Sequence, residues 1–271
     1  MKTSIAILTS LALLAVSVLP ALTADDPAAR AIMQRVDARD DGDNQTADMQ
    51  MILIDKHGAE RNRRISTFSK DKGEDTLRLM FFLQPADVRD TGFLTWDYDD
   101  FDRDDDQWLY LPALKKTKRI ASSDKSNAFM GSDLNYSDMT SRNLEDYDFC
   151  FYKKRKEMKL DGKRVWVIEA QPRSRKIVDE TGYKKSLLFV RDDIDFVIRT
   201  IGWEKSGGYI KYMEVKKLEQ IDGIWVATEM HVKKTLNKKA VHRTVLRLAN
   251  VKFNQPLEEA FFTTRQLEKG P

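Results

Sequence analysis

Cysteine is almost missing from this chain of 271 residues, since Cys150 is the only one. A single cysteine excludes an intramolecular disulfide, even in a compartment that would allow one. No cysteine stands near residue 24, where an exported lipoprotein would carry its lipid, so we do not expect this protein to be lipidated. We interpret Cys150, in the apolar stretch YDFCFY, as a small buried hydrophobic residue and not as a nucleophile.

The usual signatures of catalysis are scarce as well. The sequence has no GxSxG elbow, no phosphate-binding loop and no dinucleotide fingerprint. Of the three histidines, His57 lies at a predicted turn, while His231 and His242 lie on strands that we expect to place them nearly opposite one another. No CxxC, HExxH or third ligand supports a metal site. We therefore expect no metal, no cofactor and no enzyme activity.

Long apolar runs are confined to the N-terminus. Residues 1–24 combine the basic Lys2, an apolar run from Ile5 to Leu19 and Pro20 followed by small residues, which is typical of a cleaved secretory signal peptide. No later segment has the roughly 20 apolar residues that a spanning helix requires. We expect cleavage after Ala24 and release of residues 25–271 as a single domain.

Charge of one sign is not in excess, because the formal net charge is only +3. Such a small charge does not favour nucleic acid as a partner. The charges are instead separated locally, into the acidic run 97–106 and the basic run 115–119. The acidic run is either a solvated hairpin tip or a weak calcium loop that lacks the usual glycine and glutamate. The basic run is either a solvated strand end or a contact for lipid headgroups or an acidic partner.

What the sequence does contain is mostly strand pattern. Residues 25–42 predict one helix, with Asp26 as N-cap and Pro27 in its first turn. From residue 48 onward apolar and polar residues alternate, as in antiparallel strands. Residues 121–145 break this pattern, with a possible short helix capped by Ser137, and so long an irregular segment is usually functional. A meander of this length must curl or close to hide its apolar face and its edges.

Aromatic side chains are more numerous than one thin core requires, which suits a cavity with a lid when taken with the irregular Met- and Phe-containing segment. Ordinary core packing is the alternative. On residues 74–83 one face of the predicted strand is wholly apolar. The candidate cavity residues are Leu77, Leu79, Phe81, Leu83, Phe93, Trp96, Trp108, Tyr110, Phe129 and Met130. The candidate rim residues, for headgroup or partner contact, are Lys115, Lys116, Lys118 and Arg119.

The stretches GFLTWDY, WLYLPALKKTKRI and FMGSDLNYSDM resemble the periplasmic outer-membrane lipoprotein-sorting proteins of the LolA/LolB-like superfamily, and in particular the branch associated with RND-type exporters. The resemblance implies a mainly β (α+β) fold: a strongly curved, incompletely closed antiparallel sheet, or half-barrel. Helical plug or lid segments, here 26–39 and 121–145, would cover its concave side. The founding carrier closes its lid with an arginine on the sheet, and we assign that role to no arginine here.

The same resemblance implies a function without catalysis. We expect a periplasmic chaperone of outer membrane biogenesis that shields a lipid or lipoprotein acyl chain and carries it towards the outer membrane. Its partners would be an inner-membrane RND-type transporter and an outer-membrane acceptor, and the carrier itself would be a monomer. The alternative is an adaptor of an RND-type exporter that carries no lipid.

Overall fold

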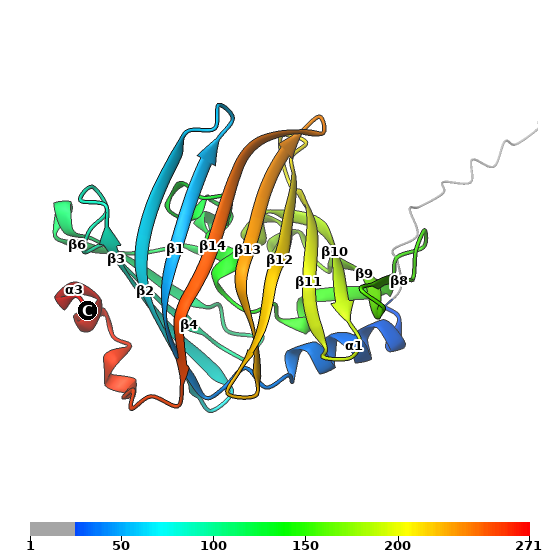
Figure 1. Cartoon of the computed structure of the whole chain (residues 1–271), viewed down its shortest axis with the longest axis horizontal. Helices are drawn as coiled ribbons and strands as arrows, with labels where there is room; N and C mark the ends of the chain where they lie inside the picture. Colours follow the sequence, from blue (N-terminus) through cyan, green and yellow to red (C-terminus); the bar gives the residue numbers. More distant parts are fainter. Residues whose placement is uncertain (1–24) are drawn as a thin grey trace, which may run out of the picture.

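The structure is a computed structural model that describes residues 25–271, so the expected signal peptide lies outside the described residues. One 14-stranded antiparallel sheet dominates it, in the order β6-β5-β4-β3-β2-β1-β14-β13-β12-β11-β10-β9-β7, with β8 paired to β9. The sheet curves strongly and its two ends do not pair with each other (Figure 1). The expected mainly β, incompletely closed antiparallel fold is confirmed.

The strands of the first arm and centre are β1 Asn44–Asp55, β2 Glu60–Lys72, β3 Asp75–Gln84, β4 Gly92–Asp97, β5 Asp106–Leu111, β6 Lys116–Arg119, β12 Ile210–Ile221, β13 Ile224–Leu236 and β14 Lys239–Phe253. The second arm contains β7 Tyr147–Phe151, β8 Glu157–Leu160, β9 Lys163–Pro172, β10 Tyr183–Arg191 and β11 Phe196–Glu204. The helices are α1 Pro27–Asp37, α2 Arg175–Thr181 and α3 Thr264–Lys269.

Tight turns set the register of the sheet. Asn237 and Lys238 both have positive φ, as a two-residue hairpin turn between right-twisted strands requires. The run 148–160 is divided into the two strands β7 and β8. A turn closes between them, where the amide of Arg155 donates to the carbonyl of Tyr152 at 3.0 Å. Consecutive cations at 153–156 repel one another less in a solvated turn than in a paired strand.

Helix α1 begins where the sequence predicts, with the Asp26 side chain accepting from two backbone amides. Its apolar stripe packs against β7, β9 and β10, in a cluster that includes Ile32, Met33 and Phe149. Helix α2 was not predicted. Its sequence signals are the Ser174 N-cap and Gly182, which ends the helix at φ 85°.

The convex side of β3–β5 is covered by the C-terminal segment. Leu77, Leu79, Phe81 and Leu94 form a buried cluster there with Phe262 and Leu267. Gly92 is required at this contact, because a Cβ at that position would lie 2.6 Å from a methyl group of Leu267.

Candidate functional site

The concave side of the sheet carries an apolar patch beneath the irregular segment 121–145, which we call the plug. Buried residues from the sheet, among them Phe82, Phe93 and Val232, meet Phe129 and Leu134 of the plug. Seven methionines belong to this patch or pack against it: Met49, Met51, Met80, Met130, Met139, Met213 and Met230. Methionine fills irregular space and changes conformation easily, so this is an adaptable apolar surface.

The predicted cavity residues are divided between the two faces of the sheet. Phe93, Phe129 and Met130 lie on the concave patch. The other seven lie on the convex face, beneath the C-terminal segment: Leu77, Leu79, Phe81, Leu83, Trp96, Trp108 and Tyr110. Successive side chains of a strand point to opposite faces, and the fully apolar face of β3 turned out to be the convex one. The mixed face, with Arg78, Met80 and Phe82, faces inward.

A buried lysine of the sheet holds the centre of the plug. Lys211 on β12 is 0% exposed, and its Nζ lies 3.0 Å from Oδ2 of Asp138 and 3.0 Å from Oδ1 of Asn135. The hydroxyl of Tyr183 donates to the same carboxylate at 2.9 Å. Burial, followed by the charge of Asp138, raises the pKa of Tyr183 well above its ordinary value, so this tyrosine stays a proton donor.

The plug makes its own helical turn for this contact. Tyr136–Met139 is a 3-10 turn with Asn135 as N-cap, not a helix capped by Ser137 as predicted. Asn135 and Asp138 cap each other reciprocally, so Asp138 both closes the turn and meets Lys211. The sequence signal was N-x-x-D at 135–138, which is a capping box shifted two residues from our expectation.

A second buried lysine ties the start of the plug to both arms of the sheet. Lys125 is 2% exposed; its Nζ lies 2.7 Å from Oε1 of Glu180 on α2 and 4.0 Å from Oδ2 of Asp105 in the β4–β5 loop. Burial, followed by the charge of Asp97, raises the pKa of Asp105 to about 6, although Lys125 opposes the shift. The acidic run 97–106 therefore helps to close the structure, and is not only a solvated tip.

Two polar contacts fix the tip of the plug. Arg63 on β2 is buried and donates to the carbonyl of Met130. Asp133 is also buried, and its Oδ2 lies 2.8 Å from Nδ1 of His242 and accepts from Thr244 Oγ1 at 2.8 Å. Sequence reasoning missed all of these contacts, because each joins residues that are distant in the chain.

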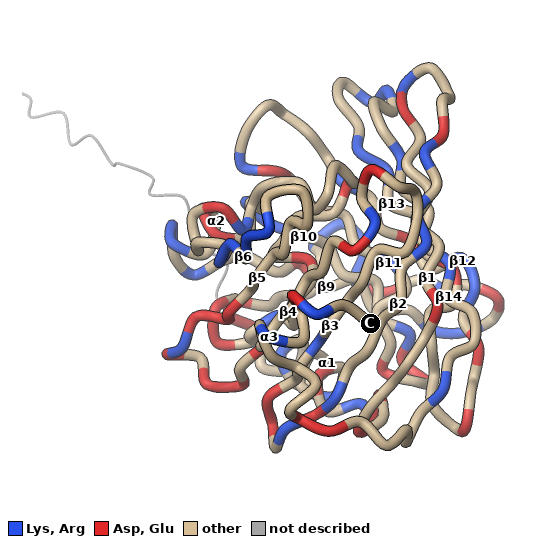
Figure 2. The backbone as a smooth tube through the Cα atoms, turned by 90° about the vertical axis from the view of Figure 1, so that its left-hand side faces the viewer, with Lys and Arg blue, Asp and Glu red and all other residues tan. Residues whose placement is uncertain are grey.

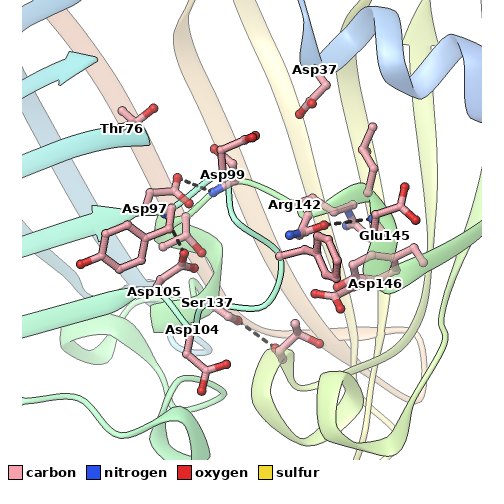
Figure 3. Close-up of a pocket in the computed structure, with 18 of the residues that line it drawn as sticks. Asp37, Thr76, Asp97, Asp99, Asp104, Asp105, Ser137, Arg142, Glu145 and Asp146 are labelled. Atoms are coloured by element: carbon pink, nitrogen blue, oxygen red, sulfur yellow. Dashed lines mark hydrogen bonds between the residues drawn. The ribbon is translucent and has the colours of Figure 1, made fainter. Parts of the chain in front are cut away.

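A cavity of about 820 Å³ opens between α1, the plug, α2 and the β4–β5 loop (Figure 3). Its carboxylates are Asp37, Asp41, Asp71, Glu74, Asp97, Asp99, Asp104, Asp105, Asp138, Glu145, Asp146 and Glu180, and its cations are Arg78, Arg103, Lys125, Arg142 and Lys176. Burial and neighbouring carboxylates raise the pKa of Asp37, Asp71 and Asp146. Met213 lines the cavity and also packs against the apolar patch, so this side chain lies between the two.

The predicted basic rim does not border this cavity. Lys115, Lys116, Lys118 and Arg119 lie at or beside β6, the outer edge strand of the sheet. Arg119 pairs with Asp106 and Lys118 with Asp124, while exposed lysines on a short edge strand discourage pairing with another sheet.

Three smaller expectations are also corrected or refined. His231 and His242 are not opposite one another, because His231 pairs with Val245 and His242 with Lys234. Within residues 25–271, no three His, Cys, Asp or Glu residues are grouped so that they could hold a metal ion. Cys150 is only partly buried, and burial raises the pKa of its thiol.

Comparison with known proteins agrees with this architecture. A family model described as an uncharacterized protein matches residues 74–269. A DUF1329 family protein from Desulfovibrio piger is 30% identical, with a TM-score of 0.81 over 90% of this chain and 100% of that one. A Vibrio parahaemolyticus structure described as an outer membrane lipoprotein-sorting protein domain is 31% identical, with a TM-score of 0.79 over 89% and 98%. Comparison with functionally curated proteins gives no match.

The fold is that of the LolA superfamily, as a superfamily member from Nitrosomonas europaea shows, with 19% identity and a TM-score of 0.66 over 88% of this chain and 98% of that one. The chain belongs to the DUF1329 family. The resemblance to outer-membrane lipoprotein-sorting proteins, stated from the sequence, is confirmed. No helix in residues 25–271 is both long and apolar enough to cross a membrane.

Proposed function

We propose that this protein is a non-catalytic periplasmic carrier, which shields a lipid or lipoprotein acyl chain on the concave apolar patch and transfers it towards the outer membrane. The observation that carries the proposal is the contrast between this methionine-rich patch and its cover. The plug rests on an apolar, adaptable surface, yet Lys211, Lys125, Arg63 and Asp133 hold it in place through buried polar contacts.

Such a cover can be exchanged for hydrocarbon. Burying a methylene is worth roughly 0.8 kcal/mol, so an acyl chain of about 16 carbons left in water costs on the order of 12 kcal/mol. A chain that displaces Phe129, Met130 and Leu134 from the patch would replace their apolar contacts with its own. The methionines would adjust to its shape.

The cavity gives this cargo a way in. Its lining is rich in carboxylates, while Met213 lies between it and the apolar patch. An acyl chain could therefore extend from the cavity beneath the plug while a polar headgroup stays in water. The similarity to the lipoprotein-sorting protein domain of Vibrio parahaemolyticus supports this assignment, as does the expected signal peptide.

Native mass spectrometry of gently purified protein tests the proposal. We expect an adduct with the mass of a lipid or an acylated peptide. The matched variants Val232→Trp, which fills the concave patch, and Leu114→Trp, which adds the same side chain at an exposed site, should differ: the first loses the adduct and the second keeps it. Protein that is free of lipid in repeated preparations from its own host would contradict the proposal.

The second candidate is an adaptor of an RND-type exporter that carries no lipid. The observation in its favour is that Phe129 and Leu134 already fill the concave patch. In that case a pull-down with the exporter would be unaffected by Val232→Trp.

A further inference from the structure

Two hairpins project side by side from one end of the sheet. The β1–β2 turn and the β13–β14 turn are neighbours because β1 pairs with β14, which sets Asp55 opposite His242 (Figure 1). Neither the plug nor a helix lies beyond these two turns in this view. In Figure 2 the backbone tube at this end of the sheet is coloured blue where lysine and arginine occur.

Six exposed cations occupy these hairpins, and we call them the hairpin cation patch: Lys56, Arg61, Lys233, Lys238, Lys239 and Arg243. Within residues 25–271 none of the six lies within 4.0 Å of a carboxylate oxygen. Of the two nearby carboxylates, Asp55 already accepts from the amides of the turn, at 2.8 Å from His57 and 3.0 Å from Ala59. The other is Glu60, so six cations face two carboxylates on these hairpins and leave an excess of positive charge.

The placement of these cations is unfavourable for the isolated protein. Lys233 and Arg243 are direct cross-strand partners, and like charges in that position destabilise a sheet. Further along the same two strands, Glu229 is opposite Arg247 and pairs with it at 3.0 Å. The charge of Arg247 is therefore compensated within the protein, whereas Lys233 and Arg243 repel each other. An external anion at the hairpins would reduce this repulsion.

We infer that the hairpin cation patch docks on the surface of an anionic phospholipid bilayer. The buried centre of a protein interface is typically enriched in apolar and aromatic residues. The exposed large hydrophobic residues of the described chain are Phe101, Leu114 and Leu160, and none of them is on these hairpins. Anionic headgroups attract clustered lysine and arginine without any apolar contact, so a bilayer fits this surface better than a folded partner.

Docking here would also bring the plug to the membrane. The patch adjoins the contacts that fix the tip of the plug, namely Arg63 with Met130 and His242 with Asp133. This consequence for cargo rests on the proposed function, whereas the docking itself does not require any cargo.

Co-sedimentation with vesicles tests the inference. We expect the protein to bind vesicles of phosphatidylcholine mixed with phosphatidylglycerol at low salt, and to be released by 0.5 M salt, because headgroup attraction is screened. The triple variant Lys56→Glu, Lys239→Glu and Arg243→Glu should bind at least about 100-fold more weakly. Pure phosphatidylcholine vesicles should not bind either protein.

A charge-matched control is available on the β7–β8 turn. Lys153→Glu, Lys154→Glu and Arg155→Glu reverse three cations that are also exposed and lie within 4.0 Å of no described carboxylate. This control should keep most of the binding. Equal weakening in both triple variants, or no binding of the wild type to phosphatidylglycerol vesicles, would overturn the assignment; in the second case an acidic protein would be the remaining partner.

Two further measurements keep the result interpretable. Unfolding curves should show that both triple variants fold, and if the glutamate variant does not, the glutamine variant of the same three residues should still weaken binding. Native mass spectrometry of the hairpin variant should show unchanged lipid content. Lost vesicle binding with retained lipid in the hairpin variant supports docking through these hairpins. Vesicle binding by a wild type that carries no lipid contradicts only the carrier proposal.

Discussion

The two faces of the sheet at β3–β5 are both apolar and both covered, but the covers are built differently. On the convex face Leu79, Phe81, Leu94 and Phe262 are all 0% exposed and pack as aliphatic and aromatic groups. On the concave face the buried Phe82 and Phe93 and the partly buried Met80 meet a plug that is held by ion pairs and hydrogen bonds. Close apolar packing makes a permanent core. A plug that is held by polar contacts over an adaptable apolar surface can instead be displaced.

The largest effect should come from damage to the permanent cover. Leu79→Glu would remove a fully buried side chain and place a charge there, at a cost above about 5 kcal/mol, which approaches the whole stability of a domain. We expect the variant to lose cooperative thermal unfolding. The exposed counterpart Leu114→Glu should melt like the wild type. A well-folded Leu79→Glu protein would contradict the placement of this residue in the convex core.

The next effect should come from breaking the central anchor of the plug. Asp138→Ala would leave Lys211 buried without its partner, which costs roughly 3–5 kcal/mol. The double variant Lys211→Met and Asp138→Leu removes both charges and should recover much of that loss. Urea unfolding gives the three free energies, and hydrogen exchange should show faster exchange in residues 121–145 of Asp138→Ala. A double variant that is as unstable as Asp138→Ala would contradict a direct pair.

The third effect depends on pH and belongs to the second anchor. The folded-state pKa of Asp105 is about 6 and its ordinary value is 3.8, so the folded protein holds this proton more tightly. Its contribution to stability is fully present below about pH 4 and is lost as the pH rises through 6. Asp105→Asn avoids the loss and should be more stable than the wild type at pH 7 by roughly 1–2 kcal/mol.

Urea unfolding at pH 4 and pH 7 measures this effect. The difference between Asp105→Asn and the wild type should be near zero at the lower pH and should grow towards the higher one. A constant difference at both values would contradict a raised pKa for Asp105.

The smallest effect on stability should come from the adaptable surface itself. The double variant Met213→Leu and Met230→Leu nearly conserves side-chain volume. After repacking, it should lower the free energy of unfolding by less than about 1.5 kcal/mol. If methionine supplies adaptability, the set of bound lipids should become narrower. Native mass spectrometry would show fewer chain lengths in the double variant, and an unchanged distribution would contradict the role of these methionines.

The sequence predicts the sheet because alternation, turn residues and the helix signals around Asp26 are local features. It also predicts that one face of β3–β5 is covered, but it assigns that face to the concave side. The alternation of Leu77, Leu79 and Phe81 shows that these side chains share a face of the strand, but not whether the sheet curves towards that face or away from it. The direction depends on where the plug and the C-terminal segment pack. The anchors at Lys211 and Lys125 are formed by residues far apart in the chain, so no local sequence pattern predicts them.

Site-specific photo-crosslinking inside the producing cell tests the central claim most directly. A benzophenone amino acid at Met213, on the concave patch, is compared with one at Trp108, on the convex face. We predict crosslinked lipid or acylated protein at Met213 and none at Trp108. Crosslinks at neither position, or equal crosslinks at both, would contradict a carrier that holds its cargo on the concave side.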